Sequence, residues 1–187
     1  MAQEADPTRE PSRPLPPHER ERFERLVLVH LDSAYNLARH LVRDADDAED
    51  VVQEACMRAL RHFAGFRGVN GRAWLLAITR NACWTLLQKR RGRRDDREFD
   101  EAMHSPEVES PAPEADLART LARVEVRRAV DALPLAFREA IVLRELEGLS
   151  YREIAEIAGV PVGTVMSRLA RARAQLARAL AGERRSG

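Results

Sequence analysis

The sequence predicts an all-α protein with two small helical domains joined by a flexible linker, the second domain containing a helix-turn-helix. Aromatic residues make up only 5% of the 187 residues, and alanine, leucine and arginine dominate, a composition that favours helices over sheets. Apolar residues recur at helical spacing in two separate regions. A segment with charges and prolines but no apolar period lies between these regions.

The same patterns set the expected domain boundaries. Five prolines among charged residues keep residues 1–17 from burying a core, so we expect a disordered tail there. The first helical domain is expected over 18–91, the linker over 92–113 and the second domain over 114–182. The formal net charge of +1 indicates little about partners, because acidic and basic clusters lie in different places.

Composition also indicates the cellular compartment. No apolar run approaches the ~20 residues of a membrane span, and the N-terminus lacks the apolar core of a signal peptide. The two cysteines, Cys56 and Cys83, form no CxxC pair, so we expect buried thiols rather than a disulfide scaffold. These features predict a cytoplasmic protein.

The first domain should begin with two helices, or with one helix that bends near Leu31–Asp32. Apolar residues keep a helical period from Phe23 to Val42 on both sides of that point. The next helix is expected over 44–63, because Asp44 can cap it and carboxylates fill its first turns, where the helix dipole favours negative charge. A turn broken by glycines then leads to a basic helix over 72–91.

One face of the helix over 44–63 carries Asp47, Asp50 and Glu54, with Gln53 beside them. A metal site is disfavoured, because side chains splayed around one helix rarely converge on one ion and no histidine joins them. A solvated acidic surface and a docking face for a basic partner both remain open at this point.

The helix over 72–91 is basic, with aromatic and amide side chains interleaved. Aromatic faces stack unpaired bases, and arginines neutralise phosphates. Trp74 is expected in the core, whereas Trp84 is compatible with either the core or a base-stacking role. The expected exposed positions include Arg80, Asn81, Trp84, Lys89, Arg90 and Arg91.

The second domain should contain four helices, of which the last two form the helix-turn-helix. Ser150 and Glu153 have the spacing of a capping box, and Gly159 suits the left-handed residue that ends a helix. Pro161 suits the first turn of the next helix. That helix should bury Val165, Leu169, Ala172, Leu176 and Leu180 and expose Thr164, Ser167, Arg168 and Arg171. Such a polar face suits the DNA major groove, although an ordinary helical hairpin with a solvated basic face would show the same period.

Taken in order, these segments resemble a bacterial RNA polymerase sigma factor of the extracytoplasmic-function (ECF) class, in the sigma-70 superfamily. The resemblance is carried by DAEDVVQEA at 47–55, RAWLLAITRNA at 72–82, and the stretches LPLAFREAIVLRELEGLSYREIA and GVPVGTVMSRLARAR in the second domain. It covers about 23–91 and 123–180. The resemblance implies a non-catalytic specificity subunit without cofactor or metal, which binds core RNA polymerase and promoter DNA.

The resemblance also implies roles for residues of the first domain, which should melt and read the −10 element. Its acidic helix would contact the β′ clamp helices of the polymerase through Asp47, Asp50, Gln53 and Glu54. Asn81 lies where the family places an asparagine near a flipped base. The nearby strand or duplex would be lined by Arg80, Trp84, Lys89, Arg90 and Arg91.

The second domain is implied to read the −35 element and to dock on the flap of the β subunit. The positions that match the family's recognition helix are Pro161, Val162, Gly163, Thr164, Ser167, Arg168, Arg171 and Arg173. Arg152 is a candidate phosphate contact. Met166 departs from the pattern, because the family often has Lys or Arg there. An anti-sigma protein is a further expected partner.

Two other function classes make different predictions. A stand-alone helix-turn-helix regulator would bind duplex DNA without polymerase, usually as a dimer on a palindrome, and would have no need of the acidic and basic helices of the first domain. A metal-dependent enzyme using the carboxylates of 44–54 would need a nucleophile and base, and the sequence offers no such constellation.

Overall fold

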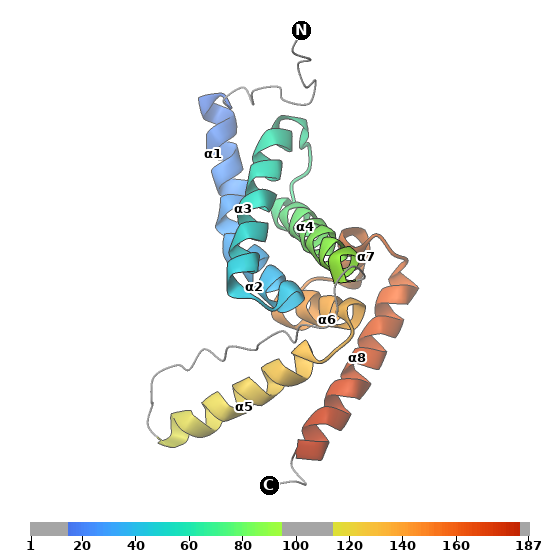
Figure 1. Ribbon diagram of the computed structural model, residues 1–187. Helices are drawn as coiled ribbons and strands as arrows, with labels where there is room; N and C mark the ends of the chain where they lie inside the picture. The colour runs from blue at the N-terminus through green and yellow to red at the C-terminus, as the bar shows by residue number, and fades with distance from the viewer. Residues whose placement is uncertain (1–14, 95–113, 184–187) are drawn as a thin grey trace, which may run out of the picture.

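The computed structural model describes residues 15–94 and 114–183, which we call the first half and the second half (Figure 1). Both consist of helices and short connections, and the described residues contain no strand. The expected linker therefore lies outside the described residues except for its first three positions, and the tail lies outside them except for residues 15–17.

Helices of the first half enclose most of its apolar residues. Their bounds are α1 (Pro17–Leu26), η1 (Leu28–His30), α2 (Leu31–Val42), α3 (Ala45–His62), η2 (Phe63–Gly65) and α4 (Gly71–Arg94). The expected break near Leu31–Asp32 is confirmed, because the short 3-10 turn η1 separates α1 from α2. The expected cap is confirmed as well, since the Asp44 carboxylate accepts a hydrogen bond from the Asp47 amide at 2.9 Å.

Two boundaries of the first half differ from those expected. α1 begins at Pro17, the last residue assigned to the tail, because proline fits the first turn of a helix. α4 continues through Gly92–Arg94, which the sequence analysis places in the linker. The flanking arginines are good helix formers, so one glycine does not end the helix.

The second half has the predicted four-helix arrangement. Its elements are α5 (Glu114–Asp131), α6 (Leu135–Ile141), the π-helical turn η3 (Val142–Leu146), α7 (Tyr151–Ala158) and α8 (Val162–Glu183). α6 and η3 are continuous and end before Gly148. The backbone there is left-handed, with a φ of +67°, a conformation that glycine adopts without steric cost. α6 packs against α8, and α7 lies across the start of α8.

Two clusters of buried side chains hold the molecule together. One belongs to the first half alone, where Phe63 meets Phe23 edge-on at 5.0 Å and Trp74 stacks on Phe66 at 4.4 Å. Trp74 thus belongs to the apolar packing, as expected. The other cluster includes Leu76 and Cys83 of α4 together with Leu143 and Ile154 of the second half.

This shared cluster packs the two halves directly against each other. α6 lies against α2, and α7 lies against α4, while α5 and α8 extend away from the first half (Figure 1). The periodicity of each helix indicates which of its faces is buried, but it does not reveal that the two halves bury these faces against each other.

Candidate nucleic-acid interface

The helix-turn-helix is built by local hydrogen bonds that the sequence encodes. The Glu153 amide donates to the Ser150 hydroxyl at 3.3 Å, and the Glu153 carboxylate accepts from the Ser150 amide at 2.8 Å, which completes the predicted capping box. Gly159 ends α7 with a φ of +65°, also as predicted. Pro161 lies one residue before α8, and its carbonyl accepts from Thr164 and Val165.

α8 has one buried face and one accessible face. Val165, Leu169 and Ala172 are buried against the other helices of the second half, as predicted. Leu176 and Leu180 were also expected to be buried, but they are half-buried because the C-terminal part of α8 extends beyond the packed helices (Figure 1). On the opposite face Ser167 and Arg171 are exposed, whereas Arg168 is half-buried. The exposed positions at the start of the motif are Arg152, Pro161, Val162 and Gly163, and Thr164 is half-buried. This leaves a polar surface at the start of α8 that can enter a groove of a partner molecule.

Arg173 differs from its neighbours on α8, because it already has an acidic partner. Its guanidinium donates to Glu145 of η3 at 2.6 and 3.1 Å, and both side chains are about half exposed. An exposed pair of this kind contributes little to stability. Arg173 can therefore exchange Glu145 for another anion at small cost.

The side chains on the basic side of α4 differ in how far they are exposed. Asn81, Lys89, Arg90 and Arg91 are exposed, whereas Trp84 and Arg80 are half-buried. The Arg80 guanidinium lies over the Trp84 ring, 4.9 Å from its centroid. The predicted residues therefore lie along one helix, but two of them, Arg80 and Trp84, are only partly accessible to a partner.

The acidic side of α3 adjoins the basic side of α4. Asp50, Gln53 and Glu54 are exposed, whereas Asp47 is half-buried and accepts a hydrogen bond from Arg90 at 2.5 Å. Glu54 accepts from Arg58 at 2.6 Å along the same helix. Two expected interfaces, one acidic and one basic, thus meet at the pair of Asp47 and Arg90.

An apolar hollow lies beside the acidic face. It measures about 440 Å³ and is lined by Leu31, Tyr35, Glu49, Val52, Gln53, Cys56 and Met57. Met57 is exposed, and burial raises the pKa of the Cys56 thiol. A surface with carboxylates next to accessible apolar atoms is suited to a protein partner.

Glu139 of α6, the most deeply buried charged side chain among the described residues, was not among the residues expected at the site. Its carboxylate accepts from the Arg80 Nε at 2.6 Å, and its side chain is 1% exposed. Burial raises the pKa of this carboxyl, against the opposing effect of the Arg80 hydrogen bond and charge. A signal was present in the sequence, because Glu139 falls on the apolar stripe that includes Leu135 and Leu143.

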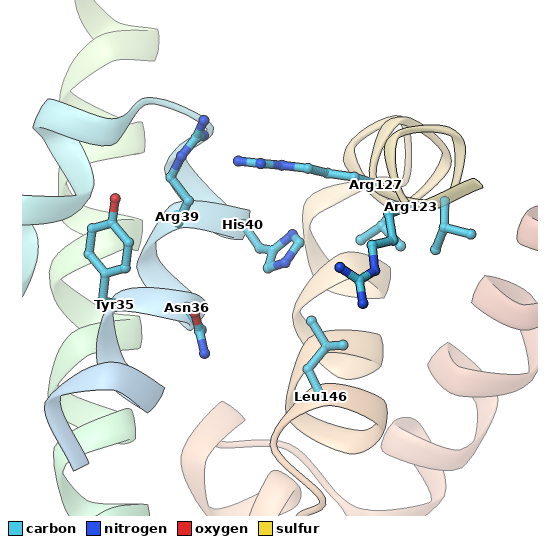
Figure 2. Close-up of a pocket in the computed structure, with 9 residues that line it drawn as sticks. Tyr35, Asn36, Arg39, His40, Arg123, Arg127 and Leu146 are labelled. Carbon is cyan, nitrogen blue, oxygen red and sulfur yellow. The ribbon is translucent and has the colours of Figure 1, made fainter. Parts of the chain in front are cut away.

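A groove lies between α2, α5 and η3, where the halves meet (Figure 2). Tyr35, Asn36, Arg39 and His40 face it from α2, Arg123 and Arg127 from α5, and Leu146 from η3. Its volume is about 580 Å³, and the described residues that line it include no carboxylate. Leu146 is 57% exposed, so the groove combines positive charge with accessible apolar surface.

Three further observations concern metal binding, thiol reactivity and membrane insertion. No group of three or more His, Cys, Asp or Glu side chains in the described parts of the chain could hold a metal ion. Burial raises the pKa of the Cys83 thiol to about 12, so this thiol is a poor nucleophile. Among the described helices, none combines the length and apolar character that a membrane span requires.

Comparison with known proteins gives a consistent set of matches. Residues 26–93 match the family model for sigma-70 region 2, and residues 123–176 match the model for sigma-70, region 4. The RNA polymerase sigma-H factor of Pseudomonas aeruginosa is 39% identical over 168 residues, which cover 84% of this chain and 86% of that protein. The ECF RNA polymerase sigma factor SigE of Mycolicibacterium smegmatis is 37% identical over 154 residues, which cover 82% of this chain and 60% of SigE.

A solved structure is also similar. It is the co-crystal structure of the sigma factor RpoE in complex with the anti-sigma factor NepR from Bartonella quintana. The match has a TM-score of 0.67 and 30% sequence identity, and it covers 86% of this chain and 97% of the RpoE chain.

Proposed function

Because the chain belongs to the sigma-70 family of RNA polymerase sigma factors, in the ECF group, we propose that its halves contact promoter and core enzyme through the surfaces described above. The chain is a non-catalytic specificity subunit that directs promoter-dependent transcription initiation. The residue roles below are supported chiefly by one observation: a capped helix-turn-helix and a basic helix each keep polar side chains accessible.

The second half reads the −35 element by placing the start of α8 in the major groove. Arg171 is free to approach a base edge or a phosphate, and Ser167 lies one helical turn before it. Arg152 of α7 is exposed beside the turn, where a phosphate contact would fix the orientation of α8. The remaining contacts of this surface are Pro161, Val162, Gly163, Thr164, Arg168 and Arg173.

The first half melts and reads the −10 element along α4. Opening DNA costs a few kcal/mol for each flipped base, and contacts to the exposed strand offset part of this cost. Asn81 is exposed and carries both a donor and an acceptor for a base edge. Trp84 and Arg80 supply stacking and charge, and Lys89, Arg90 and Arg91 continue the cationic surface.

Core polymerase binds the acidic side of α3 through Asp47, Asp50, Gln53 and Glu54. The adjoining hollow with Val52, Cys56 and Met57 would receive apolar side chains of the β′ clamp helices. The second half would dock on the β flap. The polymerase holds both halves on one DNA molecule. It thereby raises the effective concentration of each half, which binds DNA weakly by itself, at its promoter element.

Charge reversal on α3 tests this assignment. We expect Asp50→Arg to weaken assembly with core polymerase and to reduce transcription in vitro, with the helical circular-dichroism signal unchanged. Glu24→Arg on exposed α1 makes the same change in net charge and should assemble normally. Normal assembly of Asp50→Arg would remove the docking role from this face. Tight binding of the wild-type chain to a palindromic duplex without polymerase would favour a stand-alone regulator.

An anti-sigma factor is the second protein partner, and the groove of Figure 2 is its candidate site. The cations Arg39, Arg123 and Arg127, together with exposed Leu146, fit an acidic amphipathic segment. Leu146→Asp should escape inhibition by the cognate anti-sigma factor while it still supports transcription. Val69→Asp, which alters an exposed residue elsewhere, should remain inhibited. Equal inhibition of both variants would exclude the groove.

A further inference from the structure

The two halves are joined by polar contacts that share one direction. In each of three contacts the first half supplies the N–H donor and the second half supplies the carboxylate acceptor. They are Arg80 to Glu139 at 2.6 Å, Arg72 to Glu147 at 2.5 Å and Asn70 to Glu153 at 2.9 Å. The second half therefore presents anionic groups to the start and middle of α4.

Glu139 is the most buried of these carboxylates, and Arg80 is its hydrogen-bonding partner. The Glu139 side chain is 1% exposed and that of Arg80 is 19% exposed, so the pair is largely withdrawn from water. A buried carboxylate that loses its cation is left with an uncompensated charge, which is strongly unfavourable. While the halves remain packed, Arg80 is therefore held by Glu139.

Two other candidate DNA contacts act on the same carboxyl. Burial raises the pKa of Glu139, and besides Arg80 the charge of Arg168, on α8, and the indole of Trp84, on α4, oppose this rise. The Trp84 Nε1 and one Glu139 oxygen are buried and, among the described residues, lack a partner with hydrogen-bond geometry. One carboxylate thus lies among groups assigned to the −10 element and to the −35 element.

We propose that Glu139 is an internal anion that competes with promoter DNA for Arg80 and keeps the two halves of the free chain closed. This inference rests on the promoter role proposed for Arg80. A guanidinium bonded to a buried carboxylate is unavailable to a phosphate or a base, so DNA and the second half exclude each other at this group. Core polymerase relieves the competition when it holds the halves apart.

Charge reversal at Glu139 tests the proposal on the full chain. We expect Glu139→Lys to enlarge the radius of gyration in small-angle X-ray scattering, since two cations would face each other across the interface. The binding probe is fluorescent single-stranded (dT)12, and its affinity should rise roughly ten-fold if about a tenth of the wild-type chain is open. Glu145→Lys makes the same charge change at an exposed pair within the second half, so it should leave the radius unchanged.

A second variant guards against simple unfolding. The double variant Arg80→Glu/Glu139→Lys restores an opposite-charge pair and should recover the wild-type radius, with helical circular dichroism retained. An unchanged radius for Glu139→Lys, or failure of the double variant to recover compaction, overturns the closed pair. Opening without a gain in (dT)12 affinity beyond that of Glu145→Lys overturns the competition.

The promoter role itself is measured separately. In holoenzyme the halves are held by polymerase, so Arg80→Ala should reduce open-complex formation detected by permanganate. A wild-type open complex for Arg80→Ala would contradict the promoter role of Arg80, and with it the competition. The radius of gyration is measured without DNA or polymerase. Its result therefore tests the pair of Arg80 and Glu139 independently of any promoter role of Arg80.

Discussion

Gly71, the first residue of α4, shows how a single missing side chain permits a close approach of two segments. A Cβ at this position would overlap the backbone carbonyl of Leu26 at the end of α1. Because the obstructing atoms belong to the backbone, they cannot rotate away as a flexible side chain would. We expect Gly71→Ala to destabilise the chain by about 1–3 kcal/mol, as overpacking typically does.

Urea unfolding followed by circular dichroism measures this change. Gly65→Ala is the matched control, because a Cβ there would meet no atom within 4 Å and its backbone is not left-handed. Equal stability of the two variants would show that α1 and α4 separate easily at this point.

Side chains whose neighbours are local can be predicted from the sequence. The Ser150 cap and the left-handed Gly159 depend on residues within one or two turns, so their spacing predicts them. Glu139 depends instead on Arg80, which is 59 residues away in the chain. Its position on an apolar stripe indicates burial, but no local pattern identifies the cation that makes burial possible.

α7 is short, so its N-terminal cap should contribute measurably to the stability of the helix-turn-helix. Ser150→Ala removes the hydroxyl that accepts from the Glu153 amide and is expected to cost about 1 kcal/mol in unfolding free energy. Ser167→Ala is the control, because that hydroxyl donates to Thr164 within α8 and caps nothing. A similar small effect for both variants would contradict the cap.

The cost of Ser150→Ala should also depend on pH. The hydrogen bond from the Ser150 side chain, followed by that from its backbone amide, holds the pKa of the Glu153 carboxyl below its ordinary value. A lowered pKa contributes stability above the ordinary pKa of glutamate, and this stability is lost as the pH falls through the value in the folded state. The difference between wild type and variant should therefore shrink on acidification, which repeated urea titrations would reveal.

α8 carries the prediction for promoter recognition. Arg171→Ala removes an exposed guanidinium from its polar face and should weaken −35 binding by holoenzyme by about 1–3 kcal/mol if the contact is bidentate to guanine. Footprinting on −35 variants measures the effect. Arg178→Ala, two turns further along the helix, should bind normally. If the two variants bind alike, Arg171 lies outside the interface.

Helix positions are predicted better than helix ends. Apolar period, caps and turn glycines place the helices and the break before α2, because these signals reside in adjacent residues. The ends are less accurate, and α4 extends into the expected linker because its last turns contain good helix formers around one glycine. On α3 and α8 most of the expected polar side chains are exposed, although Asp47, Thr164 and Arg168 are half-buried. Part of the α4 face is covered as well.

The covering of α4 is a property of the whole molecule. In the sequence, each half satisfies an amphipathic pattern of its own. Packing of α6 on α2 and of α7 on α4 adds contacts between segments far apart in sequence, and no periodicity specifies these contacts. Both the groove at α2 and α5 and the pair of Arg80 and Glu139 arise only from this arrangement.

Shared burial leads to a prediction about unfolding. Leu76 and Cys83 of the first half lie in one cluster with Leu143 and Ile154 of the second half, so neither half can unfold without exposing side chains of the other. We expect the free chain to give one calorimetric transition, with equal calorimetric and van't Hoff enthalpies. Gly71→Ala lies in the first half, yet it should shift this whole transition, by roughly 2–4 °C for each 1 kcal/mol lost.

Glu139→Lys should uncouple the unfolding of the two halves, because the opened halves no longer share the buried cluster. Its calorimetric trace should contain two transitions, and adding Gly71→Ala should then lower only the one that belongs to the first half. Two transitions in the wild-type chain, with Gly71→Ala moving just one of them, would mean that the halves unfold independently. The shared cluster would then contribute no cooperativity between them.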